Sequence, residues 1–272
     1  MRAFVLGSGS SGNALLVESN GTRVLVDAGV GPRLLAARLE LLGLELGPGD
    51  VHGIIATHHH GDHFAEVGRL ARMFDAPVFL HAGIDEERLG QALATSERAA
   101  KPRAVELREY RIGHPFRIGA LTIENVLVPH DAPHVAVRVE DGAAAIGVAT
   151  DVGRPTNELV ALLAACDAAL VEANHCAEML AYGEYPERLK KRVGGGLGHL
   201  SNAQTADLAQ KLAGTRLGRM WLGHLSRENN TPERALEVVA SAAKRLEVEV
   251  LPHGAVCALD VKQTRPYQLA LF

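Results

Sequence analysis

Short hydrophobic runs alternate with stretches in which hydrophobic residues recur every three or four positions. In the first half of the chain, the short runs predict β-strands at Ala3–Leu6, Ala14–Val17, Thr22–Val26, Gly53–Ala56 and Pro77–Leu80. A proline is typical of the first turn of a helix, which places a helix start at Pro32. Leu35, Leu39 and Leu42 then follow with the period of one helix face. A second helix is predicted from about Asp62 to Phe74.

The second half of the chain repeats this alternation. Strands are predicted at Leu121–Val128, Val135–Val139, Ala144–Ala149, Ala168–Val171 and Met220–Leu222, and helices at Glu158–Ala165, from Ser201 and from Thr231. No low-complexity linker divides the halves, although Thr95–Arg103 is the most loop-like stretch. We therefore expect one domain over residues 1–272, built from two pseudo-symmetric halves of roughly 1–115 and 116–272. Two halves of this kind predict an α/β (α+β) fold with four layers, in which sheets lie inside and helices outside.

Composition and charge narrow the class of protein. The chain has 272 residues, of which 47% are hydrophobic and 22% charged, so it can bury a large core. A net charge of −4 argues against a protein that holds nucleic acid by bulk charge alone. No hydrophobic run is long enough to cross a membrane, and the N-terminus becomes glycine-rich too early for a signal peptide. We expect a cytoplasmic protein with no membrane contact, whose cysteines (Cys166, Cys176 and Cys257) are buried small residues.

The segment Thr57–His63 carries the pattern HxHxDH, formed by His58, His60, Asp62 and His63. It comes directly after a hydrophobic strand and before an amphipathic helix. Residues at i and i+2 of an extended segment point to the same side, so His58 and His60 can share a metal ion. Imidazole and carboxylate ligands suit zinc, iron or manganese. The alternative is a solvated, histidine-rich loop.

Four more residues with ligand side chains follow predicted strands. They are Asp27, His130, Asp151 and His224. Residues at the same ends of several strands gather into one site. A single aspartate at a strand end can equally be a cap or turn residue, and Asp27 can also be a carboxylate that orients a ligand histidine.

Taken in order, these residues resemble the pattern of the metallo-β-lactamase fold superfamily of hydrolases, and the match spans the whole chain. The resemblance implies the αββα sandwich of that superfamily. It implies that His58, His60 and His130 hold one metal ion and that Asp62, His63 and His224 hold a second. Asp151 would bridge the two ions, and Asp27 would orient the ligand residues without binding a metal ion itself. Two divalent metal ions are expected, with zinc favoured and manganese or iron as alternatives.

Three further segments narrow the resemblance to the YycJ/WalJ-type exonuclease branch of the superfamily. They are Gly7–Asn13, Glu172–Lys190 and the pair Gly198–Asn202 and His224–Asn230. The branch implies a binuclear metal-dependent phosphodiesterase, a 5′-to-3′ DNA exonuclease that uses a metal-bound hydroxide as nucleophile. DNA would be its substrate. Cys176 stands where this branch is expected to have aspartate. A thioester or ester hydrolase, or an iron-dependent persulfide dioxygenase, shares HxHxDH and stays an alternative.

The sequence Leu-Gly-His-Leu-Ser occurs twice, around His199 and around His224. A metal ligand needs rigid placement. His224 follows a hydrophobic strand, so we assign it to metal, whereas His199 follows three glycines and is assigned to substrate. Ser201 and Gln204 match a capping box, which puts His199 just before a helix N-terminus where an anion is favoured.

The predicted catalytic residues are therefore Asp62, Asp151 and His199. The predicted substrate contacts are Ser10, Asn13, His175, His199, Ser201, Lys190 and Arg192. Each has a plainer explanation. The loop of Ser10 and Asn13 can be a tight turn, His199 can be a turn residue bonded to backbone, and the basic run can be a solvated helix face.

Overall fold

The computed structural model describes residues 1–94 and 104–261, so the predicted loop Thr95–Arg103 lies outside the described residues. The described chain forms two compact units. The first contains Met1–Leu127, Asp131–Val135 and His253–Asp260. The second contains Val128–His130 and Ala136–Pro252. The first unit thus extends beyond the predicted half at residue 115 and takes a late segment of the chain as well.

A mixed sheet with the strand order β14-β1-β2-β3-β4-β5-β6 organises the first unit. Its elements are β1 (Arg2–Gly7), β2 (Ala14–Ser19), β3 (Thr22–Val26), α1 (Pro32–Leu41), β4 (Gly53–Ile55), α2 (Gly61–Phe64), α3 (Val67–Phe74), β5 (Val78–Leu80), α4 (Glu86–Leu93), β6 (Leu107–Glu109), β7 (Phe116–Ile118), β8 (Leu121–Val128) and β14 (Cys257–Asp260). Strands β14, β1, β2 and β3 pair antiparallel, whereas β3, β4, β5 and β6 pair parallel. The short strands β7 and β8 pair antiparallel.

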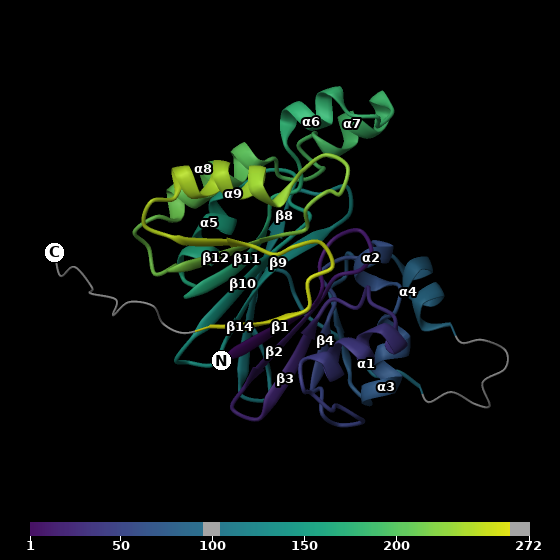
Figure 1. Cartoon of the computed structure of the whole chain (residues 1–272). Coiled ribbons are helices and arrows are strands. Elements are labelled where there is room, and N and C mark those ends of the chain that lie inside the picture. The colour runs from purple at the N-terminus through teal and green to yellow at the C-terminus, as the bar shows by residue number, and fades with distance from the viewer. Residues whose placement is uncertain (95–103, 262–272) are drawn as a thin grey trace. The chain divides into compact units, whose positions relative to one another are not determined.

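Helices α1 and α3 cover one side of this sheet (Figure 1). Leu35 and Leu39 of α1 and Leu70 of α3 are fully buried against hydrophobic strand residues such as Leu25 and Ile54. Burying side chains of this size stabilises a fold by roughly 1.5–3 kcal/mol each. The packing explains why the leucine spacing after Pro32 predicted this helix correctly.

The predicted helix from Asp62 to Phe74 is wrong, because the chain forms two helices there with a break at Ala65 and Glu66. The loop after β3 takes the hydrogen bonds that would continue the helix. Ala28 N–H donates to His63 O at 2.6 Å, and Glu66 N–H donates to Ala28 O at 3.0 Å. The break lets the short helix α2 carry Asp62 and His63 in its own orientation.

The second unit is built on the strand order β13-β12-β11-β10-β9. Its elements are β9 (His134–Glu140, of which Ala136 onward belongs here), β10 (Ala145–Ala149), α5 (Asn157–Ala164), β11 (Ala168–Glu172), α6 (Ala177–Tyr182), α7 (Glu187–Val193), α8 (Asn202–Leu212), β12 (Arg219–Gly223), α9 (Pro232–Ala242) and β13 (Glu247–Val250). Strands β10 to β13 are parallel, and β9 is antiparallel to β10. Parallel strands buried by helices read as continuous hydrophobic runs, as Ala145–Ala149 does.

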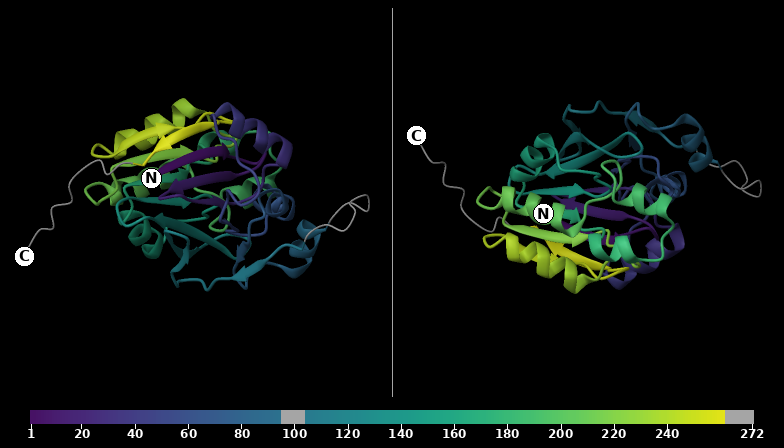
Figure 2. Two further views of the ribbon diagram at one scale, coloured as in Figure 1. Left: turned by 90° about the horizontal axis from the view of Figure 1, so that it is seen from below. Right: turned by 90° about the horizontal axis from the view of Figure 1, so that it is seen from above.

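Helices α8 and α9 run side by side in the second unit (Figures 1 and 2), and α5 packs against α8. Ser201 and Gln204 form the predicted capping box at the start of α8, which is confirmed. The two short helices α6 and α7 stand apart from α5, α8 and α9 (Figure 1).

The cysteine expectation holds only in part. Cys166 is buried, but Cys176 and Cys257 are half-buried, so the prediction that all three are core residues is wrong for these two. Cys176 precedes α6, and its sulfur lies 3.4 Å from an Arg234 guanidinium nitrogen. Among the described helices, none is both long and hydrophobic enough to span a bilayer.

Candidate metal centre

The HxHxDH segment places its histidines close together in the first unit. β4 ends at Ile55, the chain continues without regular secondary structure to His60, which is extended, and α2 begins at Gly61. The ring of His58 lies 4.8 Å from that of His60 and 4.4 Å from that of His63, measured between centroids. His58 and His63 are buried, whereas His60 is half-buried. Packing imidazoles this closely suits a shared metal environment more than a solvated loop.

Asp27 fixes the orientation of His63. Its carboxylate lies 2.7 Å from His63 Nδ1 and accepts hydrogen bonds from the backbone N–H and the hydroxyl of Thr57. An Nδ1 that donates to a carboxylate leaves Nε2 as the nitrogen that can bind metal. The Asp62 carboxylate lies 3.7 Å from that Nε2. The structure therefore brings Asp27, Asp62 and His63 together in the arrangement of a ligand pair with a supporting carboxylate.

The loop Gly7–Asn13 braces this segment. Asn13 is buried, and its backbone N–H donates to Asp62 O at 2.7 Å. The amide oxygen of Asn13 accepts a hydrogen bond from Gly9 N–H at 2.8 Å. The amide nitrogen of Asn13 lies 2.8 Å from His63 Nε2. Ser10 is exposed at the tip of the loop. The contacts of Asn13 hold the HxHxDH segment in place. Its predicted contact with substrate stays a prediction.

Close packing of the loop after β3 against α2 gives a first testable prediction. A Cβ at Gly29 would overlap the backbone oxygen of Asp62, which has no room to move because Asn13 also binds it. We expect Gly29→Ala to lower the free energy of unfolding by about 3 kcal/mol, as other changes that strain a packed core do. We also expect its metal content to fall. Urea unfolding and elemental analysis measure the two effects.

Gly90→Ala is the matched control, because a Cβ at Gly90 meets no atom within 4 Å. Gly90 lies inside α4, where alanine is the better helix former, so this variant should be at least as stable as the parent protein. If the two variants unfold alike, the proposed bracing of Asp62 by the Gly29 loop is wrong.

In the second unit, four ligand-type side chains converge. Asp151, Glu172, His199 and His224 each offer one ligand atom, and these atoms lie within 4.8 Å of one another. Asp151 and His224 follow β10 and β12 with φ values of 55° and 52°. Asp27 in the first unit has φ 63°. Residues other than glycine rarely adopt the left-handed region, and such strain concentrates at functional sites.

Glu172 is the residue that sequence reasoning missed. It is fully buried at the end of β11, where the predicted strand stopped one residue earlier at Val171. One carboxylate oxygen accepts the backbone N–H groups of Val152 at 2.6 Å and Leu200 at 2.9 Å. The other lies 3.2 Å from His199 Nδ1 and 3.3 Å from His224 Nδ1. The signal was available, since Glu172 is an acid at a strand end like Asp27 and Asp151.

Glu172 and His199 form a charged pair. Burial alone raises the pKa of Glu172, but the positive charge of His199 and its hydrogen bond lower that pKa well below the usual value. Burial alone lowers the pKa of His199, but Glu172 and Asp151 together raise it above the usual range. The Asp151 carboxylate lies 3.2 Å from His199 Nδ1. In this unit, therefore, Glu172 is ionised and His199 is protonated near neutral pH.

The donor set fits divalent metal ions. His130 donates Nδ1–H to Gly198 O at 3.2 Å, and His224 Nδ1 faces Glu172. Together with His63, three histidines place Nδ1 next to an oxygen. Each bond fixes the tautomer that metal binding needs. The Asp151 carboxylate lies 3.7 Å from His224 Nε2.

The remaining predicted residues lie outside these clusters. His175 is buried next to Ser201, with which it forms a β-bridge. Lys190 is half-buried, and its ammonium donates to Ala181 O at 2.8 Å and lies 3.3 Å from Glu187. Arg192 is exposed on α7. The structure thus ties Lys190 to protein oxygens.

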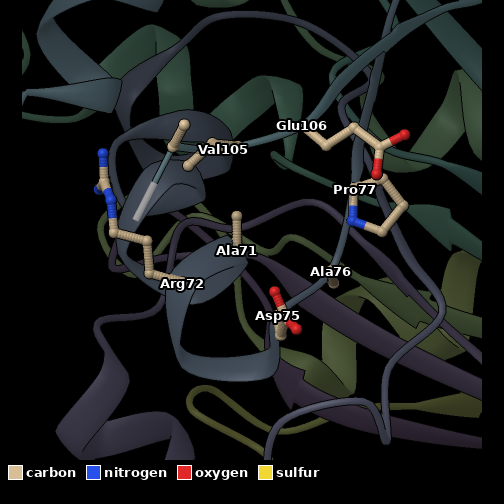
Figure 3. Close-up of a pocket in the computed structure, with 8 residues that line it drawn as sticks. Ala71, Arg72, Asp75, Ala76, Pro77, Val105 and Glu106 are labelled. Atoms are coloured by element: carbon tan, nitrogen blue, oxygen red, sulfur yellow. The ribbon is translucent and has the colours of Figure 1, made fainter. Parts of the chain in front are cut away.

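A separate cavity of about 90 Å³ lies at the C-terminal end of α3 (Figure 3). Its lining includes Ala71, Arg72, Asp75, Pro77 and Glu106. It offers two carboxylates but no histidine or cysteine, and none of the clusters of three or more ligand residues in the described chain lies there. The histidine clusters are therefore the candidate metal centre.

Comparison with known proteins agrees with these observations. Residues 22–225 match the family described as the β-lactamase superfamily domain. The chain belongs to this family. Exodeoxyribonuclease WalJ of Streptococcus pneumoniae is 34% identical over 233 residues, which cover 85% of this chain and 84% of that protein. Exodeoxyribonuclease YycJ of Bacillus anthracis is 30% identical over 235 residues, which again cover 85% and 84%.

The structure of the chain is also similar to a solved structure with the metallo-β-lactamase fold. The metallo-β-lactamase fold protein YhfI from Bacillus subtilis superposes with a TM-score of 0.70 and 18% identity, covering 94% of this chain and 98% of that one. The predicted fold class, the αββα metallo-β-lactamase sandwich, is confirmed. As a member of this family, the chain is a metal-dependent hydrolase, as the resemblance to the superfamily implied.

Proposed function

We propose that this member of the β-lactamase superfamily is a binuclear metal-dependent phosphodiesterase that degrades DNA from the 5′ end. The observation that carries the proposal is the orientation of His63, His130 and His224, each of which places Nδ1 next to an oxygen, as metal-binding histidines do. Similarity to two exodeoxyribonucleases over 85% of the chain supports DNA as substrate. A DNA substrate makes the cytoplasm the proposed location.

The proposed ligands follow the sequence pattern. His58, His60 and His130 would hold one ion, Asp62, His63 and His224 would hold the other, and Asp151 would serve as a ligand to both. Zinc suits this set of imidazoles and carboxylates, and manganese or iron would fit it too. Two such ions, when bound, lower the pKa of a water molecule and neutralise charge on the phosphoryl oxygens.

The chain's own side chains supply the remaining chemistry. Asp27 and Glu172 hold the ligand histidines in one tautomer, which keeps the ligand set preorganised. His199 carries a proton next to Asp151 and Glu172. When the phosphodiester bond breaks, the leaving oxygen needs a proton, and His199 is the group we assign to donate it.

A degradation assay with metal titration tests the function. We expect purified protein to degrade 5′-phosphorylated duplex DNA when zinc or manganese is present, to stop when EDTA removes the metal, and to recover when metal returns. Elemental analysis should find two divalent ions per chain.

Two outcomes would contradict the proposal. Hydrolysis of thioesters or simple esters with no attack on DNA would favour the small-molecule alternative. One iron per chain, with oxygen consumed in the presence of persulfides, would favour the dioxygenase alternative. A heat-denatured sample and a sample kept in EDTA throughout serve as controls for contaminating nucleases.

A further inference from the structure

A groove of about 700 Å³ lies between α6, α7 and the start of α8, within the second unit. We call it the α6–α7 groove. His175, Leu180, Glu187, Lys190, Lys191 and Gln204 are among the residues that line it. A volume of this size is in the range of sites that bind small organic molecules. The groove therefore has room for a nucleotide.

Lys191 gives the groove an available positive charge. Lys190 also lines the groove, but its ammonium is held by Ala181 O and Glu187. Lys191 is exposed and forms no ion pair or side-chain hydrogen bond within residues 1–94 and 104–261. Of the two lysines in the lining, Lys191 is thus the one whose charge is available to a phosphate.

His175 adds a buried polar group without a partner. The residue is 3% exposed, and Nδ1 has no hydrogen-bond partner among the described residues. A buried nitrogen left unsatisfied costs roughly 1–3 kcal/mol. Burial lowers the pKa of His175 to about 4, so the imidazole is neutral, with one nitrogen that donates and one that accepts a hydrogen bond.

One wall of the groove is apolar, whereas Glu187, Ser201 and Gln204 are further polar residues of the lining. Ala177, Leu180 and Ala181 of α6 face the groove, and Leu180 is buried. A base has a flat apolar face as well as polar edges, so it can lie on such a surface while its phosphate reaches a lysine. The mixture of one available cation, one neutral imidazole and an apolar wall matches a nucleotide better than a free anion.

The groove shares two chain segments with the charged cluster of the second unit. His175 lies three residues after Glu172, and Ser201 lies two residues after His199. The bridge between His175 and Ser201 joins these segments, and Asn202 N–H donates to His175 O at 2.9 Å. A strand whose phosphodiester lies at His199 can therefore place a neighbouring nucleotide in the groove.

We infer that the α6–α7 groove binds one nucleotide of the DNA strand next to the cleaved linkage, with Lys191 on its phosphate and the base against α6. The inference rests on the proposed function, because it names the place of the substrate strand beside that site. It also replaces Lys190, the lysine suggested by sequence, with Lys191.

Binding of a non-cleavable strand tests the inference. The probe is a 12-residue thymidine oligonucleotide with phosphorothioate linkages and a 3′ fluorophore, added to metal-loaded protein over a series of KCl concentrations. For Lys191→Ala we expect the Kd to rise about fivefold, the cost of one exposed charge contact. The slope of log affinity against log salt should also fall by about 0.7, the value for one phosphate on a single strand. Lys191→Arg should keep both values close to those of the parent protein.

Arg188→Ala is the matched control, because Arg188 is an exposed cation of the same helix that does not line the groove. If Lys191→Ala and Arg188→Ala behave alike while the parent protein binds and degrades DNA, the groove inference fails and the proposed function stands. If the parent protein neither binds nor degrades DNA, both the proposed function and the groove inference are wrong. Thymidine 5′-monophosphate should compete with the probe. Equal competition by inorganic phosphate would overturn the assignment of a nucleotide.

Discussion

Asp62→Ala should reduce DNA degradation by at least about 10²-fold, the scale of losing one preorganised polar group at a reaction centre. The carboxylate of Asp62 lies 3.7 Å from His63 Nε2, on the side of the ring that Asp27 leaves for a ligand. Its side chain is 26% exposed, so its removal should leave the fold intact. The measurements are initial rates on 5′-phosphorylated duplex DNA, metal content and the urea unfolding midpoint.

Glu86→Ala controls for the loss of one carboxylate in the same unit, because Glu86 is exposed in the first turn of α4. We expect this control to keep its activity and its metal content. If Asp62→Ala keeps the activity and the metal content of the parent protein, Asp62 is not a residue of the site.

The sequence predicted those parts of the fold that depend on local pattern. The leucines after Pro32, the hydrophobic runs of the strands and the capping box at Ser201 act over a few residues, and each appears in the structure. The break between α2 and α3 was not predictable in this way. It depends on Ala28, which lies more than thirty residues from the helix that it interrupts. Strand β14 pairs with β1 from the far end of the chain, so local pattern carries no signal for it.

The candidate site shows the same division. The HxHxDH motif and the strand-end residues Asp27, Asp151 and His224 were visible because their spacing is local. Which lysine of α7 is available was not visible, because it depends on Ala181 O and Glu187 holding Lys190. The short helices α6 and α7 also lack the repeated hydrophobic period that identifies longer helices.

Glu172 is where the structure adds most to the site, and its replacement should have the second large effect. The Glu172 carboxylate receives two backbone N–H groups and faces Nδ1 of both His199 and His224. In Glu172→Gln an amide N–H₂ must replace one of these oxygens and face donors. A buried donor that loses its acceptor costs roughly 1–3 kcal/mol. We therefore expect the free energy of unfolding to fall by about 3 kcal/mol. Activity should fall at least about 10²-fold, because the supporting partner of a metal ligand is worth 10- to 100-fold and Glu172 supports both the ligand His224 and the proton donor His199.

The pH dependence of unfolding separates this role from simple packing. The pKa of Glu172 is lowered in the folded chain to about 2, from 4.5. Its contribution to stability is therefore complete above pH 4.5 and is lost as the pH falls toward 2. Urea unfolding at several pH values should show a steeper loss below pH 4.5 in the parent protein than in Glu172→Gln. Glu158→Gln, an exposed change in the first turn of α5, should follow the parent curve. If Glu172→Gln also follows it, Glu172 does not hold the two histidines through its charge.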